Sequence, residues 1–409
     1  KQKQKLTQYS GIQQRCNKQK VDFQIPYKFI TKHISKLTKT QETTNIKKKT
    51  MSTSKTITYT LFIATLVASC NAAANNTTQQ HFPAILIFGD STVDTGNNNY
   101  PLNTIFRATH LPYGIDLPDH KATGRFSNGK LIPDILAAKF NIKQFVPPFL
   151  QPNLSDQEIV TGVCFASAGA GYDDKTSLST QAIRVSYQPT MFRSYIARLK
   201  SIVGDKKAIE IINNALVVVS AGTNDFILNF YTIPTRRLEY PFISGYQEFI
   251  LKRLDNFLRE LYSLGCRNIV VAGLPPIGCL PIQMTAKFRN IRRFCLEQEN
   301  KDSVTYNQIL QKQLAQTEAS LTGIKILYAN IYDPIKDMMQ KPSKYGFKET
   351  KRGCCGTGSL ETSFMCNALS PTCRNHSEFL FFDSIHPSEA TYNYVGDLLD
   401  KDIRNWIAA

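Results

Sequence analysis

The chain alternates short apolar runs with longer segments of helical periodicity. Four runs rich in β-branched residues lack the apolar–polar alternation that is typical of a strand with one solvent-exposed face. We therefore expect each of them to be a strand buried on both faces. These runs cover residues 84–88, 215–219, 268–272 and 324–329.

Between these runs, apolar positions recur every three or four residues, which predicts helices. The clearest covers residues 249–264 and ends before Gly265, a second covers 295–321, and a terminal one covers 388–406 with Ser388 as its cap. Strands that alternate with helices favour a three-layer α/β/α fold around a central, mainly parallel sheet. Ligands of such folds bind beyond the carboxyl ends of the strands, so the residues after each strand deserve scrutiny.

Charge is distributed very unevenly along the 409 residues. The net charge is +17, and residues 1–50 alone hold thirteen Lys or Arg against two acidic residues. We interpret residues 1–50 as an upstream non-native or disordered basic segment; the alternative is an arm that binds nucleic acid or anionic membrane. We favour the first interpretation because residues 51–74 read as a secretory signal, and a basic arm before them would place that signal inside the chain instead of at its start. Residues 75–409 carry only +5, so no nucleic-acid partner is predicted.

Residues 51–74 have the order of a secretory signal peptide. A charged start at Met51 and Lys55 precedes a short apolar stretch and a small-residue cleavage site near Ala72, Ala73 and Ala74. The stretch is too short for a stable membrane span. We expect a secreted, extracellular protein with one domain over residues 82–404. Glycosylation acceptor triplets begin at Asn75, Asn76, Asn153 and Asn375.

Eight cysteines follow the expected cleavage point, and an even number suits disulfides in an oxidising compartment. Cys279 and Cys295 are one candidate pair. The cysteines at 354, 355, 366 and 373 predict a disulfide-tied surface loop, because their spacing does not match the paired zinc pattern. We expect no metal. The sequence has no Gly-rich phosphate loop after a strand, so it predicts no nucleotide cofactor.

Three strand-end segments carry candidate chemistry. Ser91 follows the first strand, near an expected helix N-terminus, although a serine there is most often only a cap. Asn224 follows the second strand, where it either caps a helix or donates to an oxyanion. Asp383 and His386 are three residues apart, so the carboxylate can orient the imidazole on one turn. The alternative for this pair is an ordinary Asp-capped turn before the last helix.

Over residues 82–404, the chain resembles the plant GDSL esterase/lipase family of the SGNH hydrolase superfamily. Its four sequence blocks occur in order, and their joint occurrence is specific where each block alone is not. The first block has Thr92 in place of the usual Leu, and the second has Ala168 where the family often has Gly. The blocks are Gly89-Asp90-Ser91-Thr92 with Asp94-Thr95-Gly96-Asn97-Asn98, residues 162–171, Gly222-Thr223-Asn224-Asp225 and Asp383-Ser384-Ile385-His386-Pro387.

The resemblance implies the roles of the site residues. Ser91 matches the nucleophile, His386 the general base and Asp383 the residue that orients the imidazole. The oxyanion hole would use the Ser91 amide, the Asn224 side chain and one amide from the second block. That amide belongs to Ala168 or Gly169, and the sequence leaves the choice open. We expect loops 100–125 and 225–245 to wall the pocket.

The resemblance predicts a secreted carboxylic-ester hydrolase acting on lipid, acetylated or polyester substrates. An acyltransferase of the same fold is one alternative, because an alcohol can replace water at the acyl-enzyme. A catalytically silent binding protein is the other. The sequence specifies neither the acyl chain, the alcohol nor the oligomeric state.

Overall fold

The computed structural model describes residues 82–100, 103–233, 235–287 and 290–409. The basic segment 1–50, the expected signal peptide 51–74, Asn75 and Asn76 lie outside the described residues. Within the described residues, the helices are all too short or too polar to cross a bilayer.

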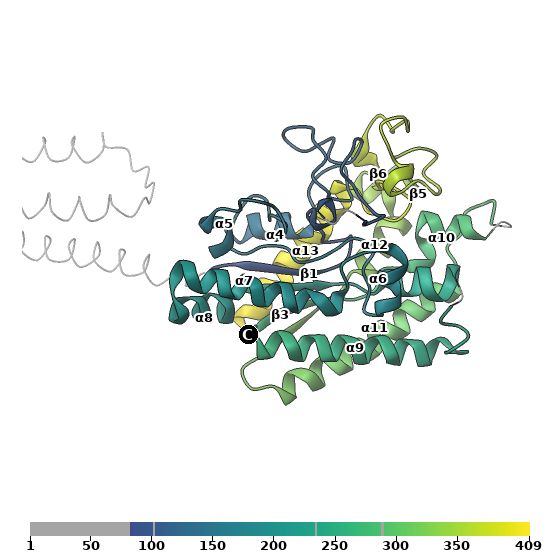
Figure 1. Cartoon of the computed structure of the whole chain (residues 1–409). Coiled ribbons are helices and arrows are strands. Elements are labelled where there is room, and N and C mark those ends of the chain that lie inside the picture. Colours follow the sequence, from purple (N-terminus) through teal and green to yellow (C-terminus); the bar gives the residue numbers. More distant parts are fainter. Residues whose placement is uncertain (1–81, 101–102, 234, 288–289) are drawn as a thin grey trace, which may run out of the picture. The chain divides into compact units, whose positions relative to one another are not determined.

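A parallel sheet forms the centre of the described domain (Figure 1). Its spatial order follows the chain, and Ile87 of the first strand pairs with Val218 of the second, which pairs with Val270 of the third. The four predicted strands are confirmed to within one residue at each end, but the fourth is only partly buried because it lies at the edge of the sheet, so its predicted burial on both faces is wrong. The strands are β1 Ile85–Gly89, β2 Leu216–Ser220, β3 Asn268–Ala272 and β4 Lys325–Ala329.

An extended segment borders β1 on its free edge, and this feature was not predicted. The Ile87 amide donates to the Val163 carbonyl, and the Phe165 amide donates to the Ile87 carbonyl. The segment is too short to stand out as an apolar run. It brings the second sequence block alongside the strand that ends before Ser91.

One face of the sheet packs against a layer of long helices. Phe88 of β1 contacts Phe192 of α7 and Phe257 of α9 edge to face. The helix predicted over 249–264 begins earlier, because Ser244 and Gly245 interrupt the apolar periodicity without ending the helix. The long helix predicted over 295–321 is confirmed, and it packs against α9 and β4. The helices are α7 Gln188–Val203, α8 Asp205–Asn214, α9 Ile243–Ser263 and α11 Glu297–Ser320.

The opposite face is covered by α4, α12 and the terminal helix α13, which runs behind β1 in Figure 1. The predicted terminal helix is confirmed, and its Ser388 hydroxyl accepts a hydrogen bond from the Thr391 amide as a cap. With helices on both faces, the predicted three-layer α/β/α fold is confirmed. The bounds are α4 Ile132–Lys139, α12 Tyr332–Gln340 and α13 Glu389–Ala408.

The remaining elements lie mainly in the connections. A second, two-stranded parallel sheet, visible at the top of Figure 1, pairs β5 with β6 just before the segment of Asp383. The segment predicted as the loop 225–245 instead begins with a π-helix, Asp225–Thr232. These elements are β5 Glu349–Gly353, β6 Phe379–Phe381, α5 Asp156–Val160, α6 Asp174–Thr180 and α10 Pro281–Ala286.

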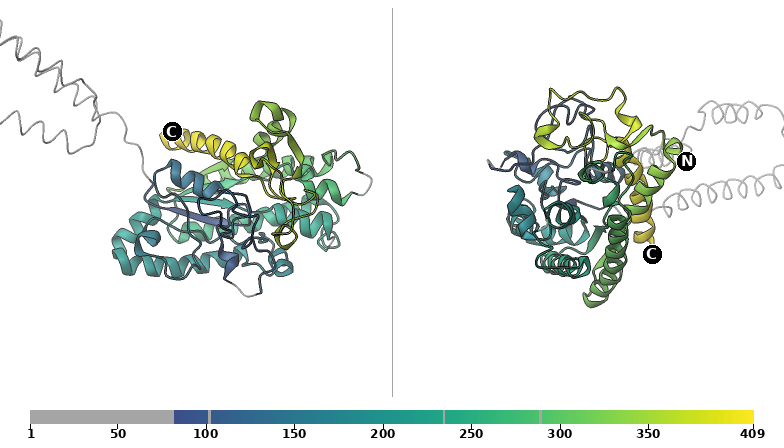
Figure 2. Two further views of the ribbon diagram at one scale, coloured as in Figure 1. Left: turned by 90° about the horizontal axis from the view of Figure 1, so that it is seen from above. Right: turned by 90° about the vertical axis from the view of Figure 1, so that its right-hand side faces the viewer.

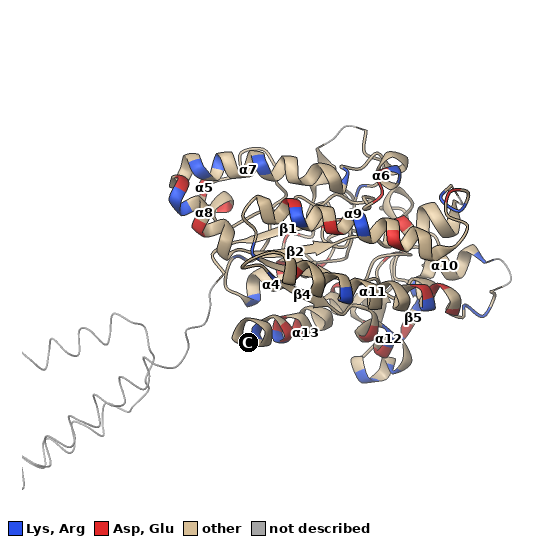
Figure 3. Ribbon diagram, turned by 90° about the horizontal axis from the view of Figure 1, so that it is seen from below, with Lys and Arg blue, Asp and Glu red and all other residues tan. Residues whose placement is uncertain are grey.

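Charged side chains lie on the helices and connections rather than on the first two strands. Figure 3 shows blue and red positions interspersed along α7, α9, α11 and α13, whereas β1 and β2 carry neither. Two views at right angles show the terminal helix along one side of the domain (Figure 2). The sheet is therefore an apolar core, and its polar chemistry is confined to the strand ends.

Candidate active site

Ser91 lies in a tight turn just beyond the carboxyl end of β1. Gly89 makes the turn possible: its φ is +139°, and a Cβ there would lie 1.9 Å from the Ser220 carbonyl oxygen. The amides of Val93 and Asp94 both donate to the Asp90 carbonyl. The helix expected after Ser91 is thus a single turn. It is followed only by a short 3₁₀ segment, Asn97–Asn99.

The structure brings Ser91, His386 and Asp383 together across 295 residues of sequence. The His386 Nε2 lies 2.7 Å from the Ser91 Oγ, and its Nδ1 lies 2.7 Å from the Asp383 Oδ2. The other carboxylate oxygen of Asp383 accepts the amides of Ile385 and His386, which fixes the turn. All three side chains are buried. The arrangement allows a proton to pass from the hydroxyl to the imidazole.

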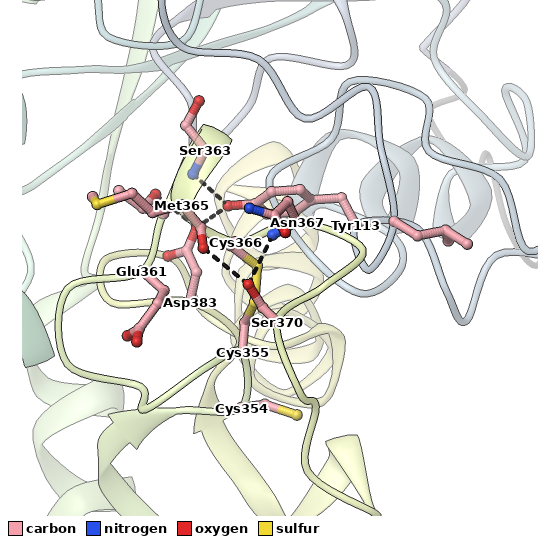
Figure 4. Close-up of a disulfide and its surroundings, with 12 residues drawn as sticks. Tyr113, Cys354, Cys355, Glu361, Ser363, Met365, Cys366, Asn367, Ser370 and Asp383 are labelled. Carbon is pink, nitrogen blue, oxygen red and sulfur yellow. Dashed lines mark hydrogen bonds between the residues drawn. A yellow bond between two sulfur atoms is a disulfide. The ribbon is translucent and has the colours of Figure 1, made fainter.

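Asp383 has two further hydrogen-bond partners that sequence reasoning missed. The Tyr113 hydroxyl, drawn beside Asp383 in Figure 4, donates to Oδ2 at 2.7 Å. The Thr362 hydroxyl donates to the same oxygen at 2.9 Å. Burial alone would raise the pKa of Asp383. The neighbouring His386 and the Tyr113 hydroxyl outweigh that effect, so the pKa of Asp383 lies below its usual value. The carboxylate is thereby kept ionised beside the imidazole.

Disulfides close the loop that leads to Asp383. Cys354 pairs with Cys373 and Cys355 with Cys366, and Figure 4 shows the second bond beneath Asp383. The predicted disulfide-tied loop is confirmed, and so is the third pair, Cys279–Cys295. Cys164 and Cys266 are buried and unpaired. The described residues contain no cluster of three or more ligand-type side chains suited to a metal ion.

The candidate amide donors differ in what they already bind. The Ala168 amide donates to the Asp94 Oδ2 at 2.9 Å, so it is not free to serve an oxyanion. The Gly169 amide has no acceptor among the described residues, and its φ of +83° suits glycine. The Asn224 Nδ2 donates one hydrogen to the Ala170 carbonyl and keeps a second. It makes no capping bond to the π-helix that follows.

Buried polar side chains, rather than cross-links, fix the segment after Ser91. Asp94 accepts the amides of Gly96 and Asn97 through one oxygen while the other holds Ala168. The Asn97 Nδ2 donates to the carbonyls of Cys164 and Ala166. The block Asp94-Thr95-Gly96-Asn97-Asn98 was the sequence signal for this network, although its structural role could not be assigned from the sequence.

A second buried polar group lies directly beside Ser91. The Thr92 amide and hydroxyl both donate to the Asp90 Oδ1, and the Thr92 hydroxyl also lies 2.9 Å from the Ser220 hydroxyl. Burial raises the pKa of Asp90 to about 6 despite these bonds. Thr92, which departs from the usual Leu of the resemblance, therefore bridges the ends of β1 and β2.

An apolar cavity of about 80 Å³ lies between the sheet and the helices α4, α12 and α13. Thr92, Ile385 and Pro387, which are next in sequence to Ser91 or His386, contribute to its lining. The lining includes neither Ser91 nor His386 and no described residue of loops 100–125 or 225–245, so this cavity does not test the predicted pocket walls. Tyr113 of the first loop supports Asp383 instead, and the second loop begins as a π-helix.

Comparison with known proteins identifies the family. Residues 85–399 match the GDSL-like lipase/acylhydrolase family. One GDSL esterase/lipase of Arabidopsis thaliana is 80% identical over 88% of this chain and 99% of its own length. Another from the same plant is 79% identical over 87% and 99%, and a more distant one is 53% identical over 82% and 94%. The chain therefore belongs to the GDSL-like lipase/acylhydrolase family.

Proposed function

We propose that the protein is a secreted esterase that cleaves carboxylic esters through a Ser91–His386–Asp383 triad and an acyl-enzyme. Its family membership makes it a carboxylic-ester hydrolase. The observation that carries the triad is the unbroken hydrogen-bond chain from the Ser91 hydroxyl through both ring nitrogens to the Asp383 carboxylate. The substrates are lipid, acetylated or polyester molecules.

In the first half-reaction, the Ser91 Oγ attacks the ester carbonyl while His386 accepts the hydroxyl proton. The imidazolium then gives that proton to the departing alkoxide, and the acyl group stays on Ser91. In the second half-reaction, His386 takes a proton from water, which attacks the acyl-enzyme. The bond between the acyl group and the Ser91 Oγ then breaks, the imidazolium returns the proton to that oxygen, and the acid is released. Asp383 stays ionised throughout and supports the imidazolium.

The negative oxygen of each tetrahedral intermediate needs amide donors. We assign these to the amides of Ser91 and Gly169 and to the second hydrogen of the Asn224 side chain. Ala168 is left out, because Asp94 already holds its amide. Losing one such donor costs about 3 kcal/mol in comparable sites. An Asp94 carboxylate that fixes the neighbouring amide would also keep the Gly169 backbone in place.

Secretion is part of the proposal. Residues 51–74 would serve as the signal peptide, with residues 1–50 outside the mature domain. The three disulfides fit an oxidising compartment. Asn153 and Asn375 are exposed, as glycosylated asparagines must be. N-terminal sequencing of the protein secreted from a plant host tests this part, and a mature chain that begins upstream of residue 72 would contradict it.

The triad is tested by replacing the nucleophile. Ser91→Ala should lower kcat for p-nitrophenyl butyrate by about 10⁶-fold, as in comparable triads. The Ser194→Ala variant removes an exposed hydroxyl on α7 and serves as the control. A fluorophosphonate probe should label the wild-type protein and the control at Ser91 but leave Ser91→Ala unlabelled. Turnover retained by Ser91→Ala would reject the triad, and an unlabelled, inactive wild-type protein would favour the silent binding protein.

A further inference from the structure

The Gly169 amide lies in a stretch of backbone, residues 168–173, whose other amides are all hydrogen-bonded within the protein. The acceptors are Asp94 for Ala168, the Ser167 carbonyl for Ala170, the Ser177 hydroxyl for Gly171, and the Asp225 carboxylate for Tyr172 and Asp173. The Gly169 amide alone has no acceptor among the described residues. Its position is therefore set by the bonds of its neighbours.

Two buried carboxylates hold this stretch, one on each side of Gly169. Asp94 accepts the amide that precedes it in the chain. Asp225 accepts the amide of Tyr172 through Oδ2 at 2.9 Å and that of Asp173 through Oδ1 at 3.1 Å. Neither carboxylate is exposed to solvent. The role of Asp94 has been described above, whereas Asp225 has so far been given none.

Asp225 also follows directly after Asn224, the second proposed donor. The Asn224 Nδ2 donates to the Ala170 carbonyl at 2.9 Å, so two adjacent residues bond to the same short stretch of backbone. A shift of Asp225 would displace both donors. On this ground, and resting on the oxyanion hole proposed above, we propose that Asp225 is a positioning residue that keeps the Gly169 amide and the Asn224 side chain directed at the oxyanion.

The surroundings of Asp225 require a carboxylate. The Thr176 hydroxyl also donates to Oδ1, at 2.5 Å, and a Cβ on Gly171 would lie 2.2 Å from that oxygen. Burial raises the pKa of Asp225 to about 7, although its three hydrogen-bond donors act in the other direction. Asparagine has nearly the same shape but only one acceptor oxygen, so its N–H₂ would face the amide of Tyr172 or of Asp173. Asp225→Asn should therefore release one of these two amides.

The experiment compares an ester with its thiono analogue, in which sulfur replaces the carbonyl oxygen. Sulfur is larger than oxygen and accepts hydrogen bonds more weakly, so a thiono ester gains little from an oxyanion hole. The measured quantity is the ratio of kcat/KM for p-nitrophenyl butyrate to that for p-nitrophenyl thionobutyrate. A loss of folded protein lowers both rates equally and leaves the ratio unchanged, whereas misplaced donors lower the rate of the oxygen ester alone.

Asp225→Asn should lower this ratio about a hundredfold, mainly through kcat for the oxygen ester, because one oxyanion donor is misplaced. Gly171→Ala displaces the same carboxylate from its other side and should lower the ratio too. Asp302→Asn is the matched control and should keep the wild-type ratio. It makes the same change at a buried carboxylate that accepts the side chains of Tyr231 and Gln298 instead of this backbone.

A pair of variants at Thr176 keeps the proposal testable if Asp225→Asn does not fold. Thr176→Val removes the hydroxyl that donates to Asp225 and should lower the ratio by a smaller factor, because both backbone amides keep their acceptor. Thr176→Ser retains the hydroxyl and should retain the wild-type ratio. Equal ratios in these two variants would contradict the proposal.

An unchanged ratio in Asp225→Asn, or an equal fall in Asp302→Asn, would overturn the positioning role. Fluorophosphonate labelling separates that result from a failure of the triad. Asp225→Asn should still be labelled at Ser91, more slowly than the wild-type protein, because Ser91 and His386 are unchanged. A wild-type protein that showed neither turnover nor labelling would reject the triad and, with it, the oxyanion hole that Asp225 serves.

Discussion

The two sides of the active site are held in place by different means. On the nucleophile side, residues 89–98 and 166–169 are fixed by buried Asp and Asn side chains that bond to the main chain. On the acid–base side, residues 353–386 carry two disulfides, and Asp383 is bonded to the Tyr113 hydroxyl from a distant segment. Ser91 and His386 meet at the boundary between these two regions.

The difference follows from how much core each region can use. The nucleophile side borders the parallel sheet, where buried backbone groups must be satisfied and side-chain amides do so. The acid–base side is a long connection outside the central sheet. It packs around a small apolar cluster of its own, which includes cysteines of the disulfides. A region with little core gains proportionately more from cross-links. The nucleophile side should therefore be sensitive to lost polar contacts, and the acid–base side to lost disulfides.

The largest effect is expected when the polar contact between Asp383 and His386 on the acid–base side is removed. Asp383→Asn should lower kcat by about 10⁴-fold, because the amide no longer holds the imidazole in its productive tautomer. Steady-state kinetics with p-nitrophenyl butyrate measure this loss. Asp116→Asn is the matched control and should keep wild-type activity. Asp116 contacts His376, so it belongs to another Asp–His pair, outside the site. A kcat within tenfold of wild type for Asp383→Asn would contradict the proposed role.

The second-largest effect is expected when a buried polar contact of the nucleophile side is removed. Arg125 forms a bidentate pair with the buried Asp134 and also donates to the Thr95 carbonyl. Arg125→Ala leaves that carboxylate unpaired, so the free energy of unfolding should fall by about 3–5 kcal/mol in urea titrations. Arg404→Ala removes a more exposed arginine paired with Asp400 and should cost less than about 1 kcal/mol. Equal losses in the two variants would be inconsistent with this account.

A third change removes one cross-link of the acid–base side. The double variant Cys355→Ser/Cys366→Ser should lose about 2–3 kcal/mol of unfolding free energy, because the disulfide restricts the unfolded chain. Cys266→Ala is the control, since it removes a buried cysteine and leaves all three disulfides. The fluorophosphonate reaction should slow in the double variant as the His386 segment loosens. An unchanged labelling rate would mean that the disulfide does not position this segment.

The smallest effect is a pH dependence that separates the two sides. Burial raises the pKa of Asp94 to about 6, above its ordinary value of 3.8. The stability from this group is therefore complete below pH 3.8 and is lost as the pH rises through 6. From pH 4.5 to 7 the wild-type protein should lose about 2 kcal/mol through Asp94, and Asp94→Asn should lack that component.

Denaturant titrations of both proteins at pH 4.5 and pH 7 measure the difference. The lowered pKa of Asp383 has the opposite sign, because its contribution is lost as the pH falls. Because that loss occurs only below the ordinary pKa of 3.8, Asp383→Asn should leave the stability change between pH 4.5 and pH 7 unaltered and serves as the control. If Asp94→Asn lost as much stability as the wild-type protein between the two pH values, Asp94 would not be protonated in the folded state.

Local pattern was sufficient to predict the sheet, whereas the proposed roles of Ser91, Asp383 and His386 rested on the joint occurrence of the four sequence blocks. Runs such as residues 215–219 are wholly apolar because both faces are covered, so their limits are visible in the sequence. The start of α9 was missed because Gly245 interrupts the pattern but is tolerated by packing. Tyr113 could not be predicted as a partner of Asp383, since 270 residues separate them and a lone tyrosine carries no periodic signal.

The choice between Ala168 and Gly169 also required three dimensions. It depends on which way the second oxygen of Asp94 points, across 74 residues of sequence. The predicted pocket walls stay a prediction. The apolar cavity is built from residues that the sequence pattern assigns to the core, such as Val218 and Val395.

The positions of Ser91 and His386 near opposite ends of the folded domain have a consequence for synthesis. A ribosome that has made residues 82–380 has already produced the serine, but the imidazole is added only at residue 386. A nascent polypeptide that stops short of residue 386 thus holds a hydroxyl without its proposed base. If the proposed triad acts, chemical competence arises only after His386 has been made, which limits premature ester cleavage by shorter products.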